Sequence, residues 1–159
     1  MDFYRILYSS KASDAMKSSD VMNIIATAQA FNKTADVTGM LLFIEDGFLQ
    51  YLEGAEETVV KLYKKIAQDS RHQNCKVLLQ GPSGQNERIF ASWNMGLKII
   101  TDSDLQDLKA MNKNPDFNLF NELEDKPDIA KELMKFFYNH GEIDFRKFWN
   151  SDNKIRKDI

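Results

Sequence analysis

The segment GMLLFIEDGFLQYLEG, residues 39–54, constrains the fold most strongly, because two apolar runs flank an Asp-Gly pair. Asp-Gly between alternating hydrophobic runs is a strong short-range signal of a β-hairpin. We therefore predict strands over residues 38–44 and 48–53, joined by a tight turn at EDG. Apolar side chains occur at both the odd and the even positions of these strands, which point to opposite faces. Both faces of the resulting sheet must therefore be covered.

One polar residue, Gln50, interrupts the second strand of this hairpin. Strand geometry places Phe48, Gln50 and Leu52 on one face and Leu49 and Tyr51 on the other. A buried amide without partners costs about 1–3 kcal/mol, so Gln50 should form hydrogen bonds inside the protein. Its partner is expected to be either a backbone group or a ligand.

The remaining periodic segments predict an α+β protein. Period-two patterns indicate strands over residues 3–9, 75–80 and 93–100, and amphipathic stripes indicate helices over residues 20–33 and 55–68. The resulting order βαββαβ, with one further strand, predicts a ferredoxin-like sheet whose two helices cover one face.

The last sixty residues are predicted to cover the other face of the sheet. Ser103 and Gln106 fit a capping box that opens one helix, and Pro127 fits the start of another that ends near Gly141. Residues 112–126 between them look like a connector. We therefore expect a domain over residues 1–101 and a helical extension over 102–159.

Composition excludes several classes of function. The formal net charge of −3 in 159 residues provides no basic footprint for nucleic acid. The single Cys75 cannot form an internal disulfide, and the sequence shows neither a signal peptide nor an apolar run long enough to span a bilayer, so we expect a cytoplasmic protein that does not bind membranes. Neither a metal-ligand cluster nor a nucleophile or phosphate-loop motif is present, so we expect no metal site and no enzymatic activity.

Three polar side chains extend from regular elements into apolar surroundings. Tyr8 lies on the first strand, Asn32 continues the apolar stripe of the first helix, and Gln50 lies on the third strand. The first and third strands are central neighbours in a ferredoxin-like sheet, so Tyr8 and Gln50 are expected to touch. This geometry predicts a ligand pocket between the two helices and above the sheet.

At these positions the sequence resembles the BLUF family, the blue-light sensors that use flavin. The resemblance covers about residues 3–100, and five motifs occur in the family's order. They are RILYSS with Tyr8, AQAFNKTADVTGMLLF with Asn32, GFLQYLEG with Gln50, LYKKIAQDSRH ending at His72, and FASWNMG with Trp93 and Met95.

The resemblance implies a non-covalently bound FAD, with FMN or riboflavin as alternatives, whose ring lies between the two helices. Asn32 would bond the pyrimidine edge of the ring, and Ile24 and Ile66 would sandwich its faces. The other implied contacts come from the sheet and from the end of the second helix: Tyr8, Phe48, Gln50, Lys65, Asp69, Arg71 and His72.

The resemblance also implies a photochemical role for four residues. Tyr8 would transiently give an electron and a proton to the excited flavin, leaving Gln50 rearranged with a new bond to the flavin carbonyl. A glutamine suits this role, because rotation or tautomerisation rewires its hydrogen bonds without creating a charge. Trp93 and Met95, expected on the last strand, would pass the change to the C-terminal helices.

The signal is expected to leave through contact with another chain: a homo-oligomer or a downstream protein effector. The interface candidates are aromatic, although they also suit packing on the sheet: Phe136, Phe137, Phe145, Phe148 and Trp149. Two other functions stay open. The first is a flavin-dependent oxidoreductase, disfavoured by the missing GxGxxG motif, and the second is an interaction scaffold that no longer binds flavin.

Overall fold

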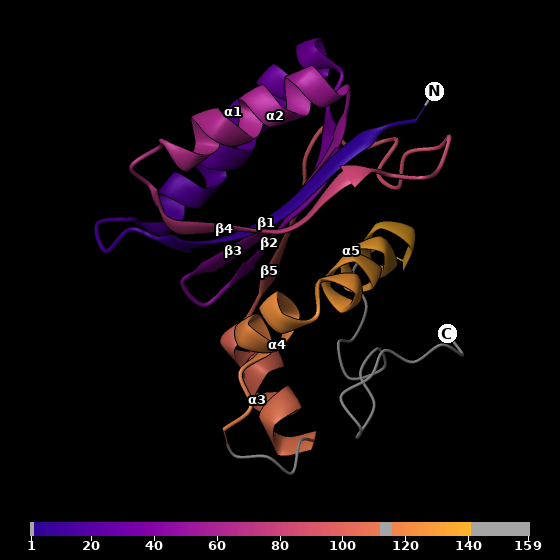
Figure 1. Ribbon diagram of the computed structural model, residues 1–159. Coiled ribbons are helices and arrows are strands. Elements are labelled where there is room, and N and C mark those ends of the chain that lie inside the picture. Colours follow the sequence, from indigo (N-terminus) through magenta and orange to yellow (C-terminus); the bar gives the residue numbers. More distant parts are fainter. Residues whose placement is uncertain (1, 112–115, 141–159) are drawn as a thin grey trace.

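The computed structural model describes residues 2–111 and 116–140 (Figure 1). In chain order its elements are β1 (Tyr4–Ala12), α1 (Ser18–Ala35), β2 (Thr38–Ile44), β3 (Gly47–Gly54), α2 (Glu56–Ala67), β4 (His72–Pro82), β5 (Gly96–Ile100), α3 (Asp102–Met111), α4 (Leu119–Asp125) and α5 (Pro127–His140).

The strands form one mixed sheet in the order β4-β1-β3-β2-β5. The hairpin β2–β3 is antiparallel, β1 pairs antiparallel with both β3 and β4, and β5 runs parallel to β2 at the edge. This arrangement confirms the predicted ferredoxin-like fold and places β1 and β3 side by side at the centre.

Helices α1 and α2 lie together over one face of the sheet (Figure 1). The predicted stripe of α1 is buried there, with Val21, Ile24 and Ile25 all less than a tenth exposed. They pack with Ile6 and Leu52 of the sheet in one core cluster. The alternation predicted for β1 and β3 is therefore confirmed, because these two strand residues share a face.

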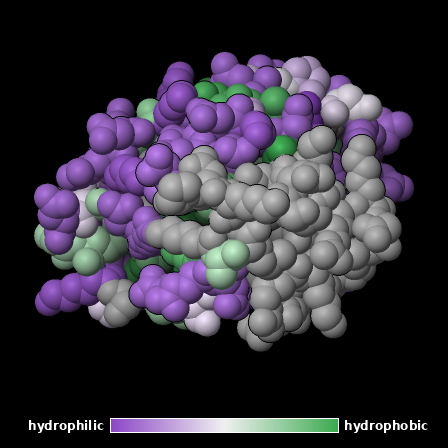
Figure 2. Space-filling model, turned by 90° about the horizontal axis from the view of Figure 1, so that it is seen from below, coloured by the Kyte–Doolittle hydropathy of each residue, from purple (hydrophilic) through white to green (hydrophobic). Residues whose placement is uncertain are grey.

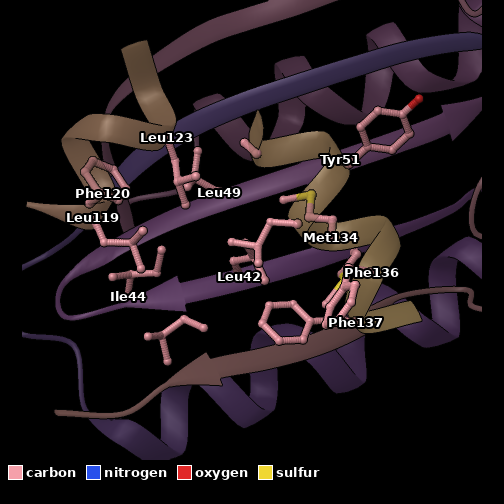
Figure 3. Packing of buried hydrophobic residues seen from close by; sticks show 14 of the residues in the cluster. Leu42, Ile44, Leu49, Tyr51, Leu119, Phe120, Leu123, Met134, Phe136 and Phe137 are labelled. Atoms are coloured by element: carbon pink, nitrogen blue, oxygen red, sulfur yellow. The ribbon is translucent and has the colours of Figure 1, made fainter. Parts of the chain in front are cut away.

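The C-terminal helices cover the opposite face, as predicted, and form a second core cluster (Figure 3). Leu119, Phe120 and Leu123 of α4 pack near one end of the hairpin, and α5 packs over the middle strands. Gly47 allows this approach, because a Cβ added there would lie 2.3 Å from the Phe120 ring. Phe136 and Phe137 are 8% and 2% exposed, so they belong to this core.

Several predicted boundaries were wrong. β1 continues to Ala12, because its outer half pairs with β3 and β4 despite a polar sequence. The predicted connector contains α4, whose Asn118 side chain accepts a hydrogen bond from the backbone N–H of Asn121. The last strand starts at Gly96 instead of residue 93, and β4 extends over His72–Pro82.

The predicted starts of two helices also differ from the structure. α1 begins at Ser18, and the Asp20 carboxylate accepts the backbone N–H of Lys17 at 2.7 Å. At the start of α3, Thr101 and Asp104 form a reciprocal cap. The Thr101 backbone N–H donates to the Asp104 carboxylate, and the Asp104 N–H donates to the Thr101 hydroxyl. The capping box thus starts two residues before the predicted Ser103. Phe145, Phe148 and Trp149 lie outside the described residues.

Viewed from the side of the C-terminal helices, most coloured atoms belong to hydrophilic residues, and apolar residues form small areas (Figure 2). Among the described helices, none has the length and apolar character needed to cross a membrane. Within the same part of the chain, no group of three His, Cys, Asp or Glu side chains is placed to hold a metal ion.

Candidate functional site

Tyr8 and Gln50 are directly opposed in the register of β1 and β3. The Tyr8 hydroxyl donates a hydrogen bond to Gln50 Oε1, and the two residues are 0% and 4% exposed. Burial raises the pKa of the Tyr8 phenol well above its usual value of 10.0. Tyr8 is therefore a neutral hydrogen-bond donor at any physiological pH.

The other end of the Gln50 amide contacts Met95. Gln50 Nε2 donates to the Met95 sulfur at 3.3 Å, and Met95 is 2% exposed. The Met95 carbonyl accepts from Gln29 Nε2 of α1 at 3.0 Å. The side chain of Gln50 thus has one strong partner, the phenol, and one weak acceptor, a thioether.

Asn32 presents an unpaired acceptor near the C-terminal end of α1. Its Nδ2 donates to the Asn94 carbonyl at 2.6 Å, while its buried Oδ1 has no hydrogen-bond partner. An unpaired buried amide oxygen costs about 1–3 kcal/mol, so its position favours a ligand that brings a donor. The single N–H of the pyrimidine edge of an oxidised flavin meets this requirement.

A pocket of about 110 Å³ lies between α1 and α2. It contains all of the flavin contacts predicted above except Tyr8 and Phe48. Tyr8 lies behind the lining: its hydroxyl bonds Gln50, and its ring contacts that of His72 with centroids 6.4 Å apart. Phe48 is fully buried against His72, with ring centroids 4.9 Å apart. The lining residues are Ile24, Thr27, Ala28, Phe31, Asn32, Gln50, Leu62, Lys65, Ile66, Asp69, Arg71 and His72.

The segment after α2 supplies the charged part of this pocket. Arg71 binds the Asp69 carboxylate through Nη2 at 2.6 Å and Nε at 3.0 Å, and these bonds lower the pKa of Asp69 to about 2. His72 is buried, its Nδ1 lies 2.8 Å from the Ser10 hydroxyl, and burial lowers its pKa. The imidazole is therefore neutral near pH 7, and the Arg71 charge is already paired.

Met95 faces the site and Trp93 faces away from it. Trp93 is half-buried and stacks edge-on against Tyr138 of α5, with ring centroids 4.8 Å apart. Both residues precede β5, so the prediction that they lie on this strand was wrong. The Gly39 N–H bonds to the Trp93 carbonyl at 3.1 Å, and this bond holds the segment beside β2.

Sequence reasoning missed two residues that support this segment. Glu53 is 1% exposed, and its carboxylate accepts the backbone N–H groups of Ile89 and Phe90 at 3.0 and 2.7 Å. The Tyr138 hydroxyl accepts the Ser92 N–H at 3.1 Å and bonds the Ser92 hydroxyl at 3.0 Å. The sequence could have pointed to Glu53, because a carboxylate within an apolar strand needs buried hydrogen-bond donors. The residues around Tyr138 in the sequence give no such indication.

A family model described as sensors of blue light using FAD matches residues 3–96. The photoactivated adenylate cyclase subunit alpha of Euglena gracilis is 37% identical over 87 residues, which is 55% of this chain and 8% of that protein. The blue light- and temperature-regulated antirepressor BluF of Escherichia coli is 39% identical over 74 residues, covering 46% of this chain and 18% of BluF. The chain thus spans less than a fifth of the length of these curated relatives.

Solved structures give the same fold. The ground state of BlsA superposes with a TM-score of 0.71 at 24% identity, covering 94% of this chain and 97% of BlsA. A bacterial light-regulated adenylyl cyclase matches with a TM-score of 0.63 at 26% identity, covering 87% of this chain but 40% of the cyclase. Because the family model covers more than half of the 159 residues, the chain belongs to the BLUF family of flavin-using blue-light sensors.

Proposed function

We propose that this chain binds a flavin between α1 and α2 and reports blue light through a rearrangement of Gln50. The observation that carries the proposal is the hydrogen-bonded row Tyr8–Gln50–Met95 at one end of a pocket that also contains the unpaired Oδ1 of Asn32. A ring with adjacent donors and acceptors on one edge can form hydrogen bonds with the side-chain amides of both Gln50 and Asn32.

The pocket favours a flat apolar ring. Ile24 and Ile66 face it from α1 and α2. Two aliphatic side chains can bury the apolar faces of a ring, which form no hydrogen bonds with water. Typical ligand pockets hold about 300–1,000 Å³, so a flavin ring needs the side chains of α1 and α2 to move apart from the 110 Å³ present. FAD is our proposed form, with FMN and riboflavin as the alternatives.

The proposed photochemistry uses the neutral phenol of Tyr8. A flavin held in this pocket would supply the absorption of blue light and, when excited, the electron acceptor. Tyr8 would give up one electron and pass its phenolic proton to Gln50 Oε1; both would return to Tyr8, so no net oxidation would remain. While the phenol is without its proton, the Gln50 amide can rotate or tautomerise, and its weak bond to the Met95 sulfur opposes this little.

The proposed output route leads from Gln50 to α5. Met95 loses or changes its contact when Gln50 rearranges, and Trp93 and Ser92, two and three residues before it, contact Tyr138. Phe90 also contacts the Tyr138 ring, with centroids 5.5 Å apart. A shift of the Ser92–Met95 segment therefore acts on α5 directly, and we propose that α5 transmits it to an effector protein or to a second copy of the chain.

The activities of the relatives do not tell which effector this chain would act on. The matched segment is 8% of the Euglena cyclase subunit, so its cyclase activity is not attributed to this chain. We propose a photosensor without catalysis of its own. A flavin-dependent oxidoreductase would instead let NADH bleach the bound flavin, and a flavin-free scaffold would stay colourless after incubation with FAD.

The test of this proposal is an absorption spectrum of the flavin-loaded chain in the dark and after blue light. We expect a yellow protein whose flavin bands move slightly to the red and return in the dark. Sedimentation and pull-down in both states test the output: equal oligomer size and equal partner recovery in dark and light would contradict signalling through another chain.

A further inference from the structure

An open hollow of about 610 Å³ lies between the C-terminal half of α1 and the segment that leads into β5. One wall is formed by Gln29, Ala30 and Lys33 of α1, and the other by residues 92–97. The hollow shares no lining residue with the pocket between α1 and α2. It is therefore a second, separate concavity, and its outer wall includes the start of an edge strand.

The outer edge of β5 is open to another strand. Among the described residues, β5 pairs only with β2, and no backbone hydrogen bond reaches its outer side. The opposite edge strand, β4, is protected, because register shifts interrupt its pairing with β1 and Asn74 adopts a φ of 54°. Irregularities of this kind bend an edge away from a new partner, whereas β5 carries none.

The side chains of β5 leave an apolar residue exposed beside the hollow. Lys98 Nζ lies 5.2 Å from the Phe137 ring centroid, and Ile100 belongs to the core under the C-terminal helices. By alternation, Leu97 and Ile99 point to the α1 side, where Ile99 is 44% exposed. A lysine on an edge strand often repels a further strand, but Lys98 is turned onto Phe137 and does not guard Ile99.

The charge of the hollow favours an acidic ligand. Lys33 is the only charged residue among those that line it, and its side chain is exposed. Within the described part of the chain, Lys33 forms no ion pair. The other polar side chains of the lining, those of Gln29, Ser92 and Asn94, are neutral. A carboxylate brought by a ligand would therefore gain an ion pair without displacing one.

The floor of the hollow is bonded to residues of the proposed switch. The Asn94 carbonyl accepts Asn32 Nδ2 at 2.6 Å, and the Met95 sulfur accepts Gln50 Nε2 at 3.3 Å. The Met95 carbonyl accepts Gln29 Nε2 at 3.0 Å. A movement of Gln50 that shifts this segment would therefore change the hollow, and by linkage a ligand in the hollow would act back on the segment to the same extent.

We propose that the hollow and the outer edge of β5 together bind an extended, acidic segment of a partner protein. The segment adds a strand to β5, packs an apolar side chain on Ile99 and directs a carboxylate to Lys33. Main-chain hydrogen bonds would supply the affinity and the two side-chain contacts the specificity. The docking site does not depend on flavin, whereas its coupling to Gln50 rests on the proposed photoreceptor function.

The first test uses a phage-displayed library of random peptides, selected on the full chain in the dark. We expect the enriched peptides to share alternating β-branched or aromatic residues and one acidic residue, because strand addition and the Lys33 charge require both. Failure to enrich any peptide, a consensus with a helical period, or a consensus without an acid would overturn the proposal.

A labelled synthetic peptide with the selected consensus then tests strand addition by fluorescence anisotropy. Its backbone nitrogens are methylated at alternate positions, in two complementary sets. One set should weaken binding at least tenfold and the other little, because only one edge of the peptide faces β5. Equal effects of the two sets would exclude a strand added to β5.

Variants of the chain test the side-chain contacts. Lys33→Gln should weaken peptide binding about two- to fivefold and Lys33→Arg should restore it. Lys64→Gln is the matched control, because Lys64 is also exposed but does not line the hollow. Ile99→Ser should weaken binding, whereas Ile99→Val should retain it. Unchanged binding in both Lys33→Gln and Ile99→Ser would overturn the docking site and leave the photoreceptor intact.

The remaining outcomes separate this proposal from the proposed function. A peptide that binds as expected to a chain without any light-induced flavin shift would uphold the docking site and overturn the photoreceptor. Equal peptide affinities in the dark and under blue light, in a chain that does show the shift, would overturn the coupling to Gln50. A fall in sedimentation mass on adding the peptide would assign the edge of β5 to a second copy of the chain and overturn the foreign partner.

Discussion

The Tyr8 hydroxyl donates a hydrogen bond to Gln50 Oε1 across the central pair of strands β1 and β3. A phenol that can give up a proton thus touches an amide that can exchange its donor and acceptor ends. Register fixes this contact, because a slip by one residue would turn either side chain to the opposite face of the sheet. The contact that we propose as the switch is therefore held by the paired strands β1 and β3.

The contact between Tyr138 and Ser92 should be needed for output but not for photochemistry. Tyr138→Phe removes both hydrogen bonds to Ser92 and keeps the ring, so it should cost about 0.5–1.5 kcal/mol per bond at most. The light-minus-dark spectrum should keep its size, while light-dependent hydrogen exchange in α5 should weaken or vanish. An unchanged exchange difference would show that α5 receives the signal elsewhere.

Asn32 should contribute strongly to flavin affinity. Asn32→Ala removes the buried Oδ1 and the bond to the Asn94 carbonyl, so flavin should bind at least tenfold more weakly. Gln29→Ala is the matched control on the same helix, because it removes a bond to the neighbouring Met95 carbonyl but no residue of the pocket. Equal losses in the two variants, measured by fluorescence titration, would argue against a direct role for Asn32.

Glu53 should stabilise the segment that leads to Trp93. Its carboxylate accepts three donors: the N–H groups of Ile89 and Phe90, and the Thr38 hydroxyl at 3.0 Å. Glu53→Gln places an amide NH₂ against at least one of these donors, and the free energy of unfolding should fall by about 1–3 kcal/mol. Urea denaturation checks this, with the exposed Glu56→Gln as control; equal midpoints would refute the role of Glu53.

The stability of the apoprotein should fall below pH 6.5 because of His72. Burial lowers the pKa of folded His72 below 6.5, so between these two values the unfolded chain binds more protons. This contribution is fully present above pH 6.5 and is lost as the pH falls towards the folded pKa. Urea titrations from pH 5 to 8 should show a smaller slope in His72→Gln than in the wild type, and equal slopes would contradict this assignment.

The sequence predicted most of the sheet and the pairing of Tyr8 with Gln50, because period-two alternation and the Asp-Gly turn act locally. The stripe of α1 also predicted that Ile24 and Asn32 share one face of the helix, whereas their contact with a ligand was implied by the family resemblance. These features depend on neighbours in sequence. They therefore need no knowledge of which distant elements meet.

Other features depend on contacts between distant segments. α4 was missed because its helix is short and is stabilised by packing Phe120 over Gly47, a contact across more than seventy positions. The inward direction of Met95 depends on the single backbone hydrogen bond from the Gly39 N–H to the Trp93 carbonyl, and the proposed role of Tyr138 depends on the docking of α5. Local propensity carries none of this information.

The central claim is that Tyr8 and Gln50 together form the light-driven switch. The most direct measurement is the absorption spectrum before and after blue light for the wild type, Gln50→Leu and Tyr8→Phe, each loaded with flavin. The account predicts a small reversible red shift in the wild type and none in either variant, although all three bind flavin. A red shift that persists in Gln50→Leu would contradict it.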